Sequence, residues 1–282
     1  MKKIGLALGG GGAKGLAHIG IIKALKEANL PIDYIAGTSM GAVVGAWYAS
    51  KLETEELEEI SVNTKRRNLF PIAEILSANK KSLFVGDAIE KLLKKYFDKD
   101  KIEDCKIPFA AVATNMKDGE PMPIKSGYLA DAVRASSSIP VVFSPVHLEG
   151  DVLVDGGLSN PVPADIVKEM GADYVIAVDV SSKWPDHNHD LFESRGFYAT
   201  MMESMAIIEY QLAKNILKEA DLVIRPSVMR FNWPDFDNAE EIISLGYREG
   251  RRFIKEIALK TGYPIPEQSP LERFFDFFSS GE

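Results

Sequence analysis

A serine between two glycines is the first group in this chain that could do chemistry. Residues 34–38 form an apolar run, Ser39 stands between Gly37 and Gly41, and a helical pattern begins directly afterwards. This Gly-x-Ser-x-Gly spacing predicts a sharp strand-to-helix turn whose strained backbone exposes the serine hydroxyl beside the first amides of the helix. A hydroxyl in that position is a candidate nucleophile. The alternative is that Ser39 only caps the helix that starts at Met40.

A glycine loop is the second such feature: residues 10–15 read Gly-Gly-Gly-Ala-Lys-Gly and follow a short apolar run. A dinucleotide fingerprint would need an acidic residue at the end of the second strand, whereas Asp33 lies at its beginning. A P-loop is excluded because Lys14 precedes its glycine and no Ser or Thr follows in register. The interpretation that remains is a loop without side chains, whose amides lie at a helix N-terminus. Such amides attract negative charge, including the oxyanion of an acyl-transfer intermediate. Lys14 either adds charge there or only solvates the first turn of the helix.

A serine nucleophile requires a base, and the histidines are the first residues to consider. The chain has four: His18 in the first helical segment, His147 before a strand, and His187 and His189 in a polar loop. The α/β-hydrolase order of serine, acid and histidine would make His187 or His189 the third member. That fold places several strands before its serine, however, and here only one strand precedes it. We therefore expect all four histidines to be surface or core residues.

Asp155 is the better candidate for the base, because it ends an apolar strand and is followed by Gly156 and Gly157. Strands and helices alternate along the chain, which predicts a mostly parallel sheet with helices on both faces. Sites in such sheets lie beyond the carboxyl ends of the strands, and we expect the glycine loop, Ser39 and Asp155 to meet there. The alternative is that Asp155 only forms an N-cap or an Asx turn.

Together, these segments resemble the patatin-like phospholipase family. The resemblance covers about residues 4–180 and rests on Gly-Gly-Gly-x-Lys-Gly, Gly-Thr-Ser-Met-Gly and Asp-Gly-Gly in that order, with further similarity over residues 113–120 and 134–140. It implies a three-layer α/β/α sandwich and hydrolysis of lipid acyl esters by a Ser-Asp dyad without a histidine. Carried over residue by residue, it implies Ser39 as nucleophile, Asp155 as base, Gly10, Gly11 and Gly12 as the oxyanion hole, and Lys14, Gly15, Gly37, Gly41, Gly156 and Gly157 as supporting motif residues. We expect neither a cofactor nor a metal ion.

Length and composition limit the other possibilities. From 282 residues, 46% of them hydrophobic, we expect a single domain, with its recognisable core over about 4–180 and a helical completion and tail over 181–282. A net charge of −8 and a pI near 5.2 argue against a nucleic-acid partner. The lone Cys105 cannot form an internal disulfide and no apolar run is long enough to span a membrane, so we expect a cytoplasmic protein. The oligomeric state is left open.

Hydrophobic periodicity predicts the elements that position these residues. Strands are expected at 3–8, 34–38, 108–114, 121–124, 151–155, 174–180 and 222–225. Helices are expected at 13–28, 40–51, 54–60, 86–96, 128–135, 163–170, 195–219 and 240–260. Residues 69–81 are expected to form a loop-rich insertion, and the strand at 174–180 is apolar enough to be central and parallel.

The leading hypothesis is a serine lipid acyl hydrolase of the phospholipase, lysophospholipase or carboxylesterase type, whose partner is a lipid or ester substrate. An acyltransferase would use the same dyad with an alcohol as acceptor, and a non-catalytic nucleotide-binding adaptor would leave Ser39 unlabelled by serine-directed probes. The methionines at 201, 202 and 205 and the phenylalanines within 271–278 could line an acyl groove or contact a membrane or micelle. Ordinary core packing is the alternative for these residues.

Overall fold

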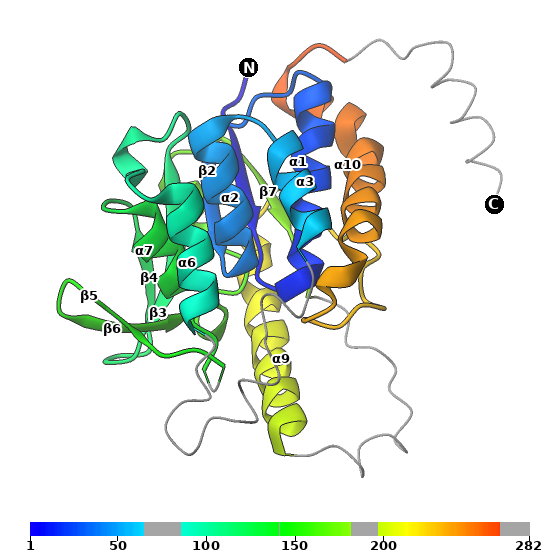
Figure 1. Cartoon of the computed structure of the whole chain (residues 1–282). Coiled ribbons are helices and arrows are strands. Elements are labelled where there is room, and N and C mark those ends of the chain that lie inside the picture. The colour runs from blue at the N-terminus through cyan, green and yellow to red at the C-terminus, as the bar shows by residue number, and fades with distance from the viewer. Residues whose placement is uncertain (65–85, 141, 182–196, 266–282) are drawn as a thin grey trace.

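Alternating strands and helices build one eight-stranded sheet in the computed structural model (Figure 1). The structure describes residues 1–64, 86–140, 142–181 and 197–265. Parallel strands form most of the sheet, in the order β3 (Phe109–Asn115), β2 (Tyr34–Thr38), β1 (Ile4–Leu8), β7 (Tyr174–Val178) and β8 (Leu222–Ile224). The mostly parallel sheet is therefore confirmed, and β7 lies in its interior as predicted.

Antiparallel strands complete the β3 edge of the sheet. β6 (Asp151–Asp155) pairs with β3, β5 (Val146–Leu148) pairs with β6, and β4 (Pro121–Ile124) returns along β3 as the predicted hairpin. The strand β5 was not predicted. It is joined to β6 by a two-residue turn, Glu149 and Gly150, with φ angles of 52° and 93°. Glutamate is not a residue that such turns favour, so this hairpin has no clear mark in the sequence.

Helices cover both faces of the sheet. One face carries α1 (Ala17–Glu27), α2 (Met40–Lys51), α3 (Glu55–Asn63), α6 (Gly86–Phe97), α7 (Leu129–Ser136) and α10 (Ala239–Thr261). The other face carries α8 (Ala164–Glu169) and the C-terminal part of α9 (Phe197–Ile216). Short 3₁₀ segments link these elements: η1 (Gly12–Leu16), η2 (Ile102–Asp104), η3 (Gly156–Leu158), η5 (Leu217–Glu219) and η6 (Phe236–Asn238). This arrangement confirms the three-layer α/β/α architecture.

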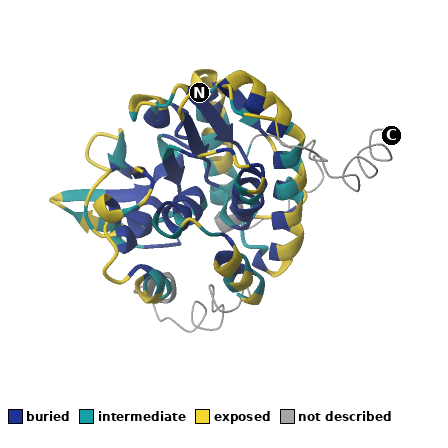
Figure 2. Cartoon of the chain, turned by 90° about the horizontal axis from the view of Figure 1, so that it is seen from above, coloured by how far each residue is buried: buried dark blue, intermediate teal, exposed yellow. Residues whose placement is uncertain are grey.

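The sheet separates two hydrophobic cores, because successive side chains of a strand point to opposite faces. In β1, Ile4, Leu6 and Leu8 belong to the core that also contains residues of α1, α2 and α10, whereas Ala7 belongs to the core beneath α8. Figure 2 shows the buried strands at the centre and exposed residues along the outer sides of the helices. The sheet is thus packed against a hydrophobic core on each of its faces.

The predicted elements that fall within the described residues are confirmed, with small shifts at their ends. The first helical segment differs most, because residues 12–16 form a 3₁₀ helix and α1 begins only at Ala17. The predictions for residues 69–81, for the polar loop that holds His187 and His189, and for residues 271–278 lie outside the described residues. Among the helices in the described ranges, none combines the length and the apolar composition needed to cross a bilayer.

Candidate active site

Ser39 lies in the predicted strained turn between β2 and α2, with φ 53° and ψ −120°. The flanking glycines are required by close packing. A Cβ atom on Gly37 would lie 2.3 Å from the Gly41 carbonyl oxygen, and one on Gly41 would lie 2.1 Å from the Leu8 carbonyl oxygen. Ser39 occupies the N-cap position of α2, but its side chain makes no capping hydrogen bond. The capping alternative is therefore wrong for the hydroxyl group, which is left available for other contacts.

Ser136, at the end of α7, holds the backbone of the turn. Its hydroxyl accepts a hydrogen bond from the Ser39 amide at 2.9 Å and donates one to the Val112 carbonyl at 2.6 Å. All three groups are buried, so the hydroxyl satisfies two backbone groups that water does not reach. Sequence reasoning missed this residue. The only sign of it was the similarity of residues 134–140 to the family, which assigned no role to any serine there.

The register of β6 against β3 places Asp155 beside Ser39. Asp155 ends β6 as predicted, but β6 runs antiparallel to β3 and therefore does not share the direction of the parallel strands. In the sheet, Thr38 is aligned with Val112 of β3, and Asp155 is aligned with Ala113, the next residue along β3. The carboxyl group of Asp155 consequently stands beside the turn that carries Ser39.

The backbone of Asp155 is anchored on both sides. Its amide donates to the Ser138 carbonyl at 2.9 Å, and its carbonyl accepts from the Thr114 hydroxyl at 2.9 Å. Ser138 belongs to the same segment as Ser136, so residues 134–140 support both Ser39 and Asp155. This shared support fixes the two side chains relative to each other.

The two carboxyl oxygens of Asp155 differ in their surroundings. Oδ1 accepts a hydrogen bond from the Gly157 amide at 2.8 Å, so the predicted Asx-turn alternative does describe this oxygen. Oδ2 is buried and has no hydrogen-bond partner of good geometry within the described residues. Burial raises the pKa of Asp155 to about 6, and the Gly157 amide and the Ser39 hydroxyl pull it back down only in part. Asp155 thus combines a buried oxygen that makes no hydrogen bond of good geometry in the described part of the chain with an interaction between its side chain and the Ser39 hydroxyl, an arrangement that can take up a proton.

The glycine loop faces the serine from the end of β1. A Cβ atom on Gly10 would lie 3.4 Å from the Ser39 Cβ atom. The Gly10 amide, however, donates to the Pro161 carbonyl at 3.0 Å. The amides of Gly11 and Gly12 donate to no acceptor in the part of the chain that the structure describes. Of the three predicted oxyanion-hole glycines, Gly11 and Gly12 are therefore the two whose amides have no acceptor among the described residues.

The remaining motif glycines lie in tight packing at the same place. A Cβ atom on Gly15 would lie 2.6 Å from the Met40 side chain, and one on Gly156 would lie 2.0 Å from the Val112 carbonyl oxygen. The loop after β1, the start of α2 and the turn after β6 are therefore in direct contact.

Lys14 is half-buried and folds over the glycine loop, with its Cε atom 3.8 Å from where a Cβ atom on Gly11 would be. Burial lowers its pKa, while the negative charges of Glu209 and Asp179 oppose this effect. Lys14 is thus partly buried beside the glycine loop, and its charge acts on Glu209 and Asp179. Glu209, on α9, is a further acidic residue at the site, and no motif in the sequence pointed to it.

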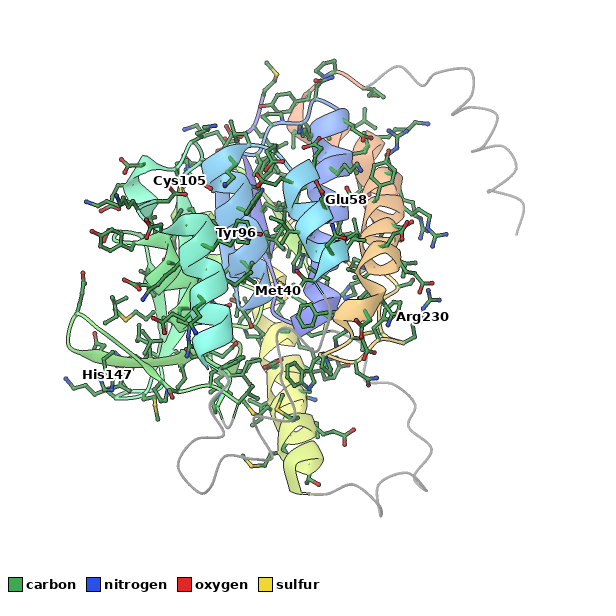
Figure 3. All side chains as sticks on the ribbon, in the orientation of Figure 1. Met40, Glu58, Tyr96, Cys105, His147 and Arg230 are labelled. Atoms are coloured by element: carbon green, nitrogen blue, oxygen red, sulfur yellow. The ribbon has the colours of Figure 1, made fainter. Side chains whose placement is uncertain are left out.

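The two histidines within the described residues are a core residue and a surface residue, as expected, and neither one makes a hydrogen bond to Ser39. His18 is buried in α1, and its Nε2 lies 2.8 Å from the Gly9 carbonyl oxygen, to which it donates a hydrogen bond. Burial lowers the pKa of His18 to about 4, so its ring is neutral near pH 7. His147 lies on β5 at the outer edge of the molecule, away from Met40, which follows Ser39 (Figure 3). The two loop histidines lie outside the described residues.

Two observations bear on metals and cofactors. Within residues 1–64, 86–140, 142–181 and 197–265, no group of three or more His, Cys, Asp or Glu side chains is placed to hold a metal ion. The groups that are gathered at the site are a hydroxyl, a carboxyl, open amides and a lysine, which is a set suited to acyl transfer.

Comparison with known proteins identifies the family of this chain. The family model described as Patatin-like phospholipase matches residues 6–168, more than half of the chain. Among curated proteins, the chain is 31% identical over 291 residues to "Lysophospholipase nte1" of Neosartorya fischeri, and the match covers 95% of this chain and 19% of that protein. It is 32% identical over 291 residues to "Lysophospholipase NTE1" of Coccidioides immitis, covering 95% and 18% respectively. This chain thus spans about a fifth of the length of the curated relatives that it matches.

A solved structure agrees with the fold. The crystal structure of VipD from Legionella pneumophila aligns with a TM-score of 0.50 at 14% sequence identity, over 90% of this chain and 67% of that one. The matched range contains the glycine loop, the serine turn and the aspartate turn that the fold brings together. The predicted resemblance is confirmed: the chain belongs to the patatin-like phospholipase family.

Proposed function

We propose that this chain is a serine lipid acyl hydrolase in which Ser39 is the nucleophile and Asp155 is the base. One observation carries the proposal. Ser39 has a strained backbone and a hydroxyl that does not cap α2, and it lies beside Asp155, whose buried Oδ2 atom makes no hydrogen bond of good geometry within the described residues. An unsatisfied buried acceptor is costly to a protein, and such groups are concentrated where function needs them.

The chemistry follows from this geometry. Ser39 Oγ attacks the carbonyl carbon of an ester, and Asp155 Oδ2 takes up the hydroxyl proton as the new C–O bond forms. The amides of Gly11 and Gly12 stabilise the negative charge that develops on the carbonyl oxygen. Collapse of the intermediate breaks the ester C–O bond, and the leaving alkoxide takes the proton from Asp155. Water then repeats the sequence on the acyl-enzyme, which releases the fatty acid and restores Ser39.

The names of the family and of the two curated relatives suggest a class of substrate. The family is named for phospholipases, and the two relatives above are named as lysophospholipases. Acyl esters of glycerophospholipids, and lysophospholipids first, are therefore the substrates to try. Lys14 lies beside the open amides and adds positive charge where the oxyanion would form.

Covalent labelling tests the proposal directly. We expect a fluorophosphonate probe to form one adduct, which mass spectrometry maps to Ser39, and we expect Ser39→Ala to lose the adduct. The same variant should lower kcat/KM on a lysophospholipid by roughly 10²–10⁴ or more, because the covalent route is removed. Ser126→Ala, at an exposed serine, is the matched control and should behave as the wild type. An adduct at another serine, or full activity in Ser39→Ala, would show that the proposal is wrong.

A further inference from the structure

A second carboxyl group, that of Glu209, lies beside the Asp155 turn. The helix α9 runs outward from the body of the molecule (Figure 1), and its inner part contacts η3, the segment that follows Asp155. Glu209 Oε1 lies 2.7 Å, and Asp155 Oδ1 lies 3.1 Å, from the point where a Cβ atom on Gly157 would be. The two carboxyl groups therefore approach the same small region from different elements.

The charged surroundings of Glu209 come from three elements. Within the described residues, Asp155 from the end of β6 and Lys14 from η1 are the charged groups that act on it. Lys14 is in turn influenced by Asp179, which follows β7. Asp179 has its own partner, since its Oδ2 atom lies 3.6 Å from Nε of Arg225. The positive charge of Lys14 thus acts on both Glu209 and Asp179, while Asp179 also pairs with Arg225.

These surroundings affect the protonation of Glu209. Its side chain is half-buried, but its carboxyl end is directed at the turn. Burial and, to a smaller extent, the charge of Asp155 raise the pKa of Glu209 to about 7, against the opposing charge of Lys14. Two carboxyl groups this close lose their protons in two linked steps, of which the second leaves both of them charged.

We propose that Glu209 is a positioning residue that acts through Asp155, because its ionised carboxylate makes Asp155 a stronger base. This inference rests on the proposed function. A single aspartate is a weak base for an alcohol, since its ordinary pKa is about 3.9. A negative charge held nearby increases the proton affinity of Asp155 and so favours transfer from the Ser39 hydroxyl.

The variant Glu209→Gln separates this role from a structural one. Glutamine resembles protonated glutamic acid in size and hydrogen bonding but cannot ionise. We expect wild type and variant to have nearly equal kcat/KM at about pH 5.5, and the wild type to exceed the variant by roughly three- to tenfold at about pH 8.5. The control Glu203→Gln, also on α9, should differ from the wild type by a factor that does not change with pH.

The outcome that would overturn the inference is a ratio of wild type to Glu209→Gln that stays constant over this pH range. Should the variant fail to fold, the wild type alone supplies the test through the rate of fluorophosphonate labelling at Ser39. That rate should rise in two steps, near pH 6 and near pH 7, and a single step would contradict the proposal. If Ser39 is not labelled at all, the proposed function itself has failed. If it is labelled but the ratio is constant, only the role of Glu209 is wrong.

Discussion

Asp155→Asn should make the protein more stable while it abolishes activity. Asparagine has nearly the same shape, and its side-chain oxygen can still accept the 2.8 Å hydrogen bond from the Gly157 amide. The turn after β6 should therefore be retained. What the variant loses is the group that can take the Ser39 proton, and we expect kcat/KM to fall by roughly 10²–10⁴.

The gain in stability follows from the buried charge. Asp155 is 5% exposed, and its pKa rises from 3.8 to about 6 in the folded protein. One pKa unit corresponds to about 1.4 kcal/mol, so ionising this carboxyl group in the folded state costs about 3 kcal/mol. The stability associated with the protonated form is fully present below about pH 4 and is lost as the pH rises through about 6. Asparagine has no such step.

Urea denaturation of wild type and Asp155→Asn at about pH 4.5, 6 and 8 measures this difference. The free energy of unfolding of the variant, relative to the wild type, should increase by about 2 kcal/mol between pH 4.5 and pH 8, because about a third of the effect is already present at pH 4.5. Asp98→Asn, at an exposed aspartate, is the control and should show no such increase. A difference that does not vary with pH would show that Asp155 is not held at a raised pKa. Retained activity would remove it from the mechanism.

Two further variants test the support of the serine turn. Ser136→Ala removes the acceptor of the Ser39 amide, so we expect a loss of about 1–3 kcal/mol in denaturation and roughly tenfold lower kcat/KM. The neighbouring Ser137→Ala removes a buried hydroxyl that has no hydrogen-bond partner among the described residues, so it should not lower the stability. Equal effects of the two variants would refute this account. Gly41→Ala places a Cβ atom 2.1 Å from the Leu8 carbonyl oxygen, so thermal melts should show a loss of about 3 kcal/mol or more. A stable, active Gly41→Ala protein would mean that the elbow has more space than its packing indicates.

Local features were predictable because neighbouring residues decide them. Alternating apolar residues and helical spacing depend on a few consecutive positions, and the helix at Met40–Lys51 was predicted with the ends it has in the structure. The glycines around Ser39 likewise predicted a strained turn, and φ of Ser39 is 53°. The family resemblance was predictable for the same reason, since each of its motifs is a short contiguous segment.

The sequence placed Asp155 at the end of a strand, as the structure does, but it did not reveal that this strand runs antiparallel to β3. The direction of β6 depends on a hairpin whose turn contains Glu149, and on pairing with β3, a distant segment. The sequence also did not reveal that the Gly10 amide donates a hydrogen bond to the Pro161 carbonyl, because these two residues are far apart in the chain. A backbone amide looks the same in every sequence until its acceptor is known.

The sequence by itself determined most of the segments that become strands and helices, though not β5, as well as where the backbone bends at Ser39 and to which family the chain belongs. Only the tertiary structure decided that Ser136 holds the serine turn, that Oδ2 of Asp155 lacks a good partner among the described residues, and that Glu209 stands beside that aspartate. Backbone conformation is governed largely by adjacent residues, whereas burial, strand register and the charge around a carboxyl group depend on residues that are far apart in the chain.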